Sequence, residues 1–147
     1  MWVFVVSLAF GQESWVPSPA FVDAARALSA RDGAFDCAAV EALATDSVAL
    51  LRELVDHAQN PPWVAMRAAD CLVTGHAVEA AADLDAWVVD PERRGLGILV
   101  LGRLDVLPEP MAISLAQRAM TAGPNPTSAK RRIERATSAA VRAVVAP

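Results

Sequence analysis

A pattern of helical residues occurs twice in this chain, over residues 47–75 and again over residues 77–104. Residues 67–75, RAADCLVTG, align with residues 94–102, RGLGILVLG, at an offset of 27 positions. The offset pairs an arginine with an arginine at one end and a glycine with a glycine at the other. A period of about 20–50 residues is typical of proteins that stack supersecondary units. The repeat therefore predicts helical hairpins packed against one another.

Composition agrees with a single helical domain. A chain of 147 residues can bury a core of its own, and aromatic residues make up only 5% of it. Alanine and leucine, which are abundant here, favour helices, whereas strands favour aromatic and β-branched residues. We therefore expect an all-α fold, a short α-solenoid of about four helical hairpins in one domain over residues 12–147. The expected helices cover residues 20–30, 37–44, 47–58, 63–74, 77–88, 91–102, 109–122 and 128–145.

Capping residues and prolines mark the ends of the expected helices. Asp46 and Asp90 are suited to cap the helices that follow them. Pro62 and Pro91 suit the first turn of a helix, because that turn needs no backbone N–H. Gly75 is typical of a helix C-terminus. These signals agree with the boundaries that the repeat predicts.

The turns of the two repeats also carry a family pattern. Asp90 precedes a proline and Arg94 follows shortly after it, and the second helix ends in the sequence Leu-Val-Leu-Gly. This unit resembles HEAT-type repeats, including the HEAT-like group first noted in phycobilisome lyases, in which such an Asp and Arg form a ladder along the stack. Arg67 matches the arginine of the other copy, while Asn60 stands in place of the aspartate. The resemblance implies an α-solenoid that binds partners on a curved surface, and it implies no particular activity.

The first residues form a separate apolar segment, WVFVVSLAF at positions 2–10. This segment is too short to span a bilayer, which needs about 20 residues, so we expect no stable membrane span. Ala9 and Gly11 are small residues at the positions that a signal peptidase reads, although no Lys or Arg precedes the segment. We interpret residues 1–11 as a signal peptide, which would place the protein in the periplasm or outside the cell. The alternative is a cytoplasmic protein in which this segment packs on the domain.

The compartment also bears on the two cysteines. In an exported protein Cys37 and Cys71 could form a disulfide, whereas in the cytoplasm they would be small buried apolar residues. Sequence alone does not place their Cα atoms within bridging distance, so we favour unpaired cysteines. Two cysteines without a CxxC motif do not predict a zinc site, and we expect neither a metal site nor a cofactor.

Two tryptophans lie near the inter-helix turns of the repeats, and each is close to an arginine. Trp63 with Arg67 and Trp87 with Arg94 could frame an interaction surface, because tryptophan is enriched at binding hot spots. The alternative is that both rings cover the edge of the core between stacked hairpins. We favour the core position for the rings and keep the four residues as the candidate surface.

The end of the chain is basic although the formal net charge is −4. Arg131 and Arg135 share one helical face, and Arg142 lies close to that face two turns later. With their basic neighbours they could contact phosphates, or they could be the solvated face of the last helix. The acidic total and the expected export favour the solvated face, so we expect no nucleic-acid binding. The candidate basic patch comprises Lys130, Arg131, Arg132, Arg135 and Arg142.

Catalytic signatures are absent from the sequence. Gly95 and Gly97 lack the third glycine of a dinucleotide-binding motif, and no P-loop or nucleophile elbow is present. His57 and His76 have no metal-ligand partner at a suitable spacing. We therefore expect a non-enzymatic HEAT-like domain that serves as a scaffold for another protein. A nucleic-acid-binding repeat and an enzyme on a HEAT-like scaffold are the two alternatives.

Overall fold

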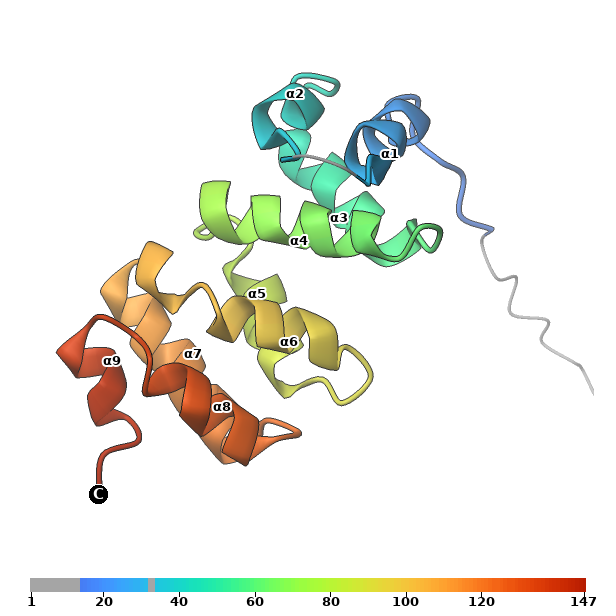
Figure 1. Cartoon of the computed structure of the whole chain (residues 1–147). Helices are drawn as coiled ribbons and strands as arrows, with labels where there is room; N and C mark the ends of the chain where they lie inside the picture. The colour runs from blue at the N-terminus through green and yellow to red at the C-terminus, as the bar shows by residue number, and fades with distance from the viewer. Residues whose placement is uncertain (1–13, 32–33) are drawn as a thin grey trace, which may run out of the picture.

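A computed structural model describes residues 14–31 and 34–147, and within these ranges every regular element is a helix (Figure 1). The predicted all-α class is confirmed. The expected signal peptide, residues 1–11, lies outside the described residues. None of the described helices is long and apolar enough to cross a bilayer. The helices are α1 (Phe21–Ser29), α2 (Cys37–Glu41), α3 (Ser47–His57), α4 (Trp63–Gly75), α5 (Ala81–Val89), α6 (Arg94–Leu101), η1 (Leu104–Val106), α7 (Glu109–Ala122), α8 (Pro126–Ile133) and α9 (Ala139–Ala143).

Consecutive helices pair as hairpins, and the hairpins pack on one another in chain order. Helix α3 pairs with α4, α5 with α6, and α7 with α8. Between hairpins, α5 packs on α7. On the other side of the stack α4 packs on α6, and α6 packs on α8. Figure 1 shows this succession from the green α4 through α6 to the red α8. Helix α6 therefore lies between α4 and α8.

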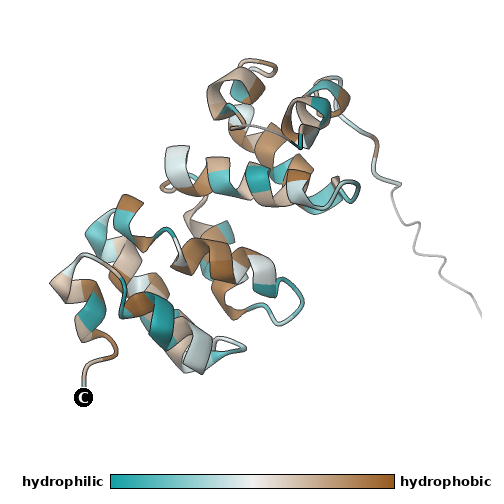
Figure 2. Cartoon of the chain, viewed as in Figure 1, coloured by the Kyte–Doolittle hydropathy of each residue, from teal (hydrophilic) through white to brown (hydrophobic). Residues whose placement is uncertain are grey.

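Small apolar side chains make up much of the core. Ala68 and Ala69 of α4 and Ala116 of α7 are fully buried, as are the larger Leu72 and Leu84. Alanine lets two helix backbones approach closely, and burial of each methylene removed from water contributes about 0.8 kcal/mol. Figure 2 shows that much of the ribbon of α6 is hydrophobic.

The closest approach inside a hairpin occurs at Gly97 of α6. A Cβ atom at this position would lie 2.7 Å from the main-chain oxygen of Trp87 in α5. Only glycine allows the two backbones this contact, which accounts for a residue that otherwise weakens a helix. Gly95, two residues earlier, faces outward, and a Cβ there would meet only the side chain of Met66 at 3.6 Å.

Most of the predicted helix ends agree with the structure within a few residues. Asp46 caps α3, with its carboxylate accepting a hydrogen bond of 2.9 Å from the Ala49 amide. The helix expected from residue 77 begins at Ala81 instead, because residues 77–80 form turns.

The single last helix expected over residues 128–145 is wrong. Helix α8 ends at Ile133 and α9 begins at Ala139. Asp105 accepts hydrogen bonds from the Thr137 amide at 2.7 Å and from its hydroxyl at 2.9 Å. Ser138 then caps α9 at the Val141 amide. These contacts hold the backbone in a turn, and they outweigh the helical periodicity of the segment.

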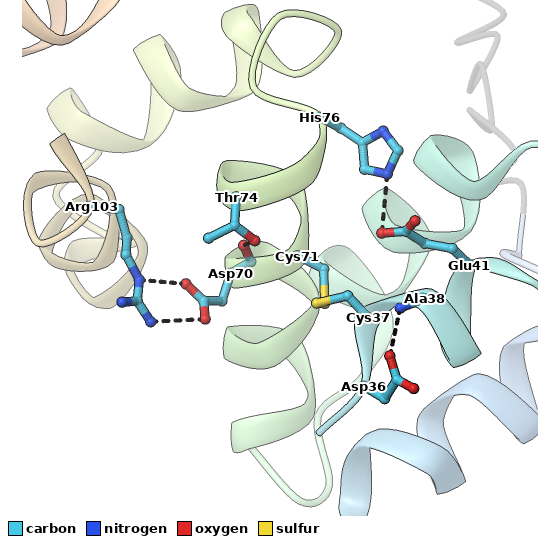
Figure 3. The surroundings of a disulfide bond; sticks show 9 residues. All are labelled: Asp36, Cys37, Ala38, Glu41, Asp70, Cys71, Thr74, His76 and Arg103. Atoms are coloured by element: carbon cyan, nitrogen blue, oxygen red, sulfur yellow. Dashed lines mark hydrogen bonds and ion pairs between the residues drawn. A yellow bond between two sulfur atoms is a disulfide. The ribbon is translucent and has the colours of Figure 1, made fainter. Parts of the chain in front are cut away.

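The expectation of unpaired cysteines is also wrong. Cys37 and Cys71 form a disulfide that joins α2 to α4, with their Cα atoms 5.6 Å apart (Figure 3). The bond closes a loop with a sequence separation of 34 residues, and Cys71 is fully buried. The short helix α2 therefore has a covalent connection to the centre of the domain.

Loss of the disulfide should lower the free energy of unfolding by about 2–4 kcal/mol, because the unfolded chain gains loop entropy. Urea unfolding followed by far-ultraviolet circular dichroism, with and without dithiothreitol, measures this change. The double variant C37S/C71A is the control, since dithiothreitol should leave its unfolding curve unchanged. A parent protein that is equally stable in both conditions would contradict a native disulfide.

The variant Gly97→Ala should lose about 1–3 kcal/mol of stability, because its methyl group would overlap the Trp87 carbonyl oxygen. Gly95→Ala makes the same chemical change in the same helix without that overlap, so it should be neutral or slightly stabilising. Urea unfolding of both variants tests the close approach of α5 and α6. Equal effects of the two substitutions would argue against it.

Candidate interaction surface

Trp63 and Arg67 are used inside the fold. The Trp63 indole N–H donates a 3.2 Å hydrogen bond to the Ser29 carbonyl, which lies at the end of α1. One guanidinium nitrogen of Arg67 donates at 2.6 Å to each of the carbonyls of Leu28 and Ala30. The last carbonyls of a helix lack partners within the helix, and here these two side chains satisfy them. Their role is therefore to hold α1 against α4.

Trp87 and Arg94 lie at a different place. The Trp87 side chain is only 4% exposed and belongs to the core, whereas Trp63 is partly buried against it. Both residues line a small pocket of about 60 Å³ between α5–α6 and α7–α8, with Ile98 and Leu101 beside them. The four residues of the candidate surface therefore form two pairs with different neighbours, and only Arg94 among them is exposed.

The Asp–Arg ladder implied by the HEAT resemblance does not form at Asp90 and Arg94. Arg94 Nε donates to the Pro91 carbonyl at 3.2 Å. The neighbouring Arg93 is the residue that pairs, with Asp56 of α3 at 2.8 Å and more distantly with Asp90 at 3.9 Å. The arginine that contacts the neighbouring hairpin is therefore Arg93, one residue before the position that the family pattern implies.

Other ion pairs connect each hairpin to the next. Arg103 binds Asp70 through two hydrogen bonds of 2.8 and 3.0 Å, and Arg118 binds Asp85 through two of 3.1 and 3.2 Å. The hydrogen bonds that Arg103 donates to Asp70, together with the charge of this carboxylate, raise the pKa of Arg103 above its ordinary value. Exposed pairs of this kind contribute about 1 kcal/mol or less each. We infer that they mainly set the register of adjacent hairpins.

A groove runs along α6, bordered by α3 and α4 at one end and by η1 and α8 at the other. Three hollows of about 300, 280 and 190 Å³ compose it. The first two share Met66 and Gly95, and the second and third share Gly102 and Arg132, so each hollow borders the next. We call it the α6 groove. Its central part is lined by Met66, Gly95, Ile98, Leu99, Gly102, Arg103 and Arg132.

The apolar part of this groove comes from residues that the sequence analysis did not single out. Ile98 is 41% exposed although it is a large aliphatic residue, and Leu99 and Met66 are half-buried beside it. Ile98 also lines the Trp87 pocket, so it stands between the two cavities. In the sequence Ile98 belongs to the repeat pattern, which gave no signal that it faces outward.

The candidate basic patch is divided by the turn between α8 and α9. Arg132 and Arg135 line the end of the α6 groove. Arg142 is engaged elsewhere, because its guanidinium donates to the carbonyls of Ala136 and Thr137 at 2.7 and 2.6 Å. Lys130 and Arg131 are exposed and do not line the groove. The single basic face that we expected is therefore wrong, since it required an unbroken helix.

The histidines lie outside the α6 groove. The His57 ring stacks on Trp15 with 4.1 Å between ring centroids. His76 Nε2 lies 3.1 Å from Glu41 Oε1, near the disulfide (Figure 3). In residues 14–31 and 34–147 no three His, Cys, Asp or Glu side chains come together as a metal site would require. The groove offers a ligand aliphatic surface and guanidinium groups, with one carboxylate at each end, Asp56 and Asp105.

The variant Arg67→Ala should lower the free energy of unfolding by about 1–3 kcal/mol, because two carbonyls at the end of α1 lose a charged hydrogen-bond donor. Arg94 is the equivalent residue of the other repeat, and it donates a hydrogen bond only within its own turn. Arg94→Ala should therefore change the free energy of unfolding by less than about 0.5 kcal/mol. Chemical unfolding of the two variants measures the difference. Similar losses of stability in the two variants would contradict the different roles of Arg67 and Arg94.

Comparison with known proteins yields no family assignment. No protein-family model, curated protein or solved structure matches this chain. The resemblance of residues 47–104 to HEAT-type repeats thus remains a prediction from the sequence pattern.

Proposed function

We propose that this chain is a non-enzymatic helical-repeat domain of the HEAT-like, α-solenoid type that binds another protein in the α6 groove. The observation that carries the proposal is the row of neighbouring hollows along α6, from Met66 on α4 to Arg132 on α8. A surface shared by three packed helices changes little in shape when a partner binds. It can therefore bind a protein segment without a large cost of ordering.

The chemistry of the groove supports a protein as the partner. Aliphatic residues such as Ile98 and Leu99 supply apolar area, and arginine is enriched at protein interfaces. A large exposed aliphatic residue is unfavourable in water and gains free energy when a partner covers it. Ile98 beside Arg132 combines both kinds of contact within one hollow.

We further propose that the domain works outside the cytoplasm. The Cys37–Cys71 disulfide supports this, because such bonds persist in oxidising compartments and are rare in the cytosol. The apolar segment at residues 2–10 supports it independently, through its likeness to a signal peptide. The partner is then a periplasmic, secreted or surface protein.

Peptides selected from a displayed random library on the oxidised full chain test the groove directly. Their affinity should fall about tenfold or more for Ile98→Asp, because a buried carboxylate would face apolar ligand atoms. Val78→Asp is the matched control, since Val78 is 71% exposed and lies outside the groove. Its affinity for the same peptides should stay within about twofold of the parent, measured by fluorescence polarisation.

Two outcomes would contradict the proposal. Selected peptides that bind Ile98→Asp as tightly as the parent would show that the groove is not the binding surface. Equal losses for Ile98→Asp and Val78→Asp would show a general effect of added negative charge. Thermal unfolding of both variants should match the parent, because neither side chain is buried.

A further inference from the structure

We propose that the α6 groove selects an acidic segment of its partner, in which carboxylates flank an aliphatic residue. This inference rests on the proposed protein-binding function and adds the chemistry of the ligand. Arg132 and Arg135 would bind the carboxylates, and Ile98 with Met66 and Leu99 would contact the aliphatic side chain.

The state of Arg132 is the first observation. Among the described residues Arg132 forms no ion pair, although its side chain is only half-buried. By contrast, Arg93, Arg103 and Arg118 each bind a carboxylate. A carboxylate is the acceptor that matches a guanidinium best, and the described part of the fold supplies none to Arg132. Arg132 therefore has donor capacity that the fold itself leaves unused.

The second observation is that the groove leaves this guanidinium accessible. Arg132 is half-buried, and one of its terminal nitrogens lies beside Gly102, where a Cβ atom would be in ordinary contact with it at 3.6 Å. Arg132 lines both the central hollow and the end hollow of the groove, and Arg135 lines the end hollow with it. A ligand that lies along α6 can therefore reach both arginines.

The length of the groove favours an extended segment that carries both an aliphatic side chain and a carboxylate. Gly95 and Gly102 are separated by about 10 Å of helix, from a rise of about 1.5 Å per residue. About three residues of extended chain cover this distance. An aliphatic side chain over Ile98 thus leaves the next acidic side chain of the segment within reach of Arg132.

A polyanion such as nucleic acid fits the groove less well than an acidic peptide. The groove contains no exposed aromatic ring on which a base could stack. Asp56 lines one end of it and Asp105 the other, where each would repel a continuous row of phosphates. An acidic segment with few carboxylates can place them at the arginines alone.

The test uses a fluorescein-labelled peptide with the sequence Gly-Glu-Leu-Glu-Val-Glu-Gly and its analogue with glutamine in place of each glutamate. The oxidised full chain should bind the acidic peptide about tenfold or more tightly than the analogue. Arg132→Gln should weaken binding of the acidic peptide about tenfold, as measured by fluorescence polarisation. Arg131→Gln is the matched control, because it removes the same charge one residue away, outside the groove, and should change affinity less than about twofold.

Each contrary outcome has a separate meaning. Equal binding of the acidic peptide and its glutamine analogue overturns the inference. Tighter binding of an oligothymidine than of the peptide also overturns the inference, if Arg131→Gln and Arg132→Gln weaken that binding equally. Such a result would indicate general attraction of polyanions. Library peptides that lack Asp and Glu but depend on Ile98 overturn the acidic specificity and leave the proposed function standing. Library peptides that ignore Ile98→Asp defeat the proposed function itself.

Discussion

Burial of small apolar side chains between successive helices is the interaction on which this structure depends. A single hairpin of this chain cannot cover its own apolar face, so α4 packs on α6 and α6 on α8. The fully buried alanines Ala68, Ala69 and Ala116 keep the helix backbones close, and Gly97 brings α6 against the carbonyl of Trp87. The exposed ion pairs between hairpins add little free energy by comparison, and they serve to align one hairpin with the next.

Helix α6 combines a buried face with a ligand-accessible face because of where its glycines lie. Gly97 points inward and permits the contact with α5. Gly95 and Gly102 lie in the groove, where the lack of a side chain leaves the surface open between Met66 and Arg132. The same short sequence therefore accounts for the packing of the middle hairpin and for the shape of the proposed binding site.

The hairpins could be predicted from the sequence because their signals are local. A cap such as Asp46 or a terminating residue such as Gly75 acts within one helical turn. The Cys37–Cys71 bond, the Asp105–Thr137 contacts and the use of Arg67 could not be predicted, since each joins residues more than 30 positions apart. Periodicity alone carries no information about such contacts.

The candidate site was predictable only in part, for the same reason. Arg132 and Arg135 belonged to the predicted basic patch, but the patch assumed one continuous helix. Trp63 and Trp87 were candidates for a surface because tryptophan is common at interfaces, yet tertiary contacts hold one at the end of α1 and bury the other. Ile98 gave no signal, since an aliphatic residue in a helix is more often buried than exposed.

Nuclear magnetic resonance of the isotopically labelled, oxidised full chain, titrated with a library-selected peptide, tests the central claim most directly. If the α6 groove is the binding surface, amide shifts will change at Met66, Ile98 and Gly102, with a change at the Arg132 side-chain Nε–H. Residues on the opposite helices, such as Ala49, Ala82 and Gln117, will keep their shifts. Changes confined to those residues of α3, α5 and α7, with none in the groove, would contradict the account.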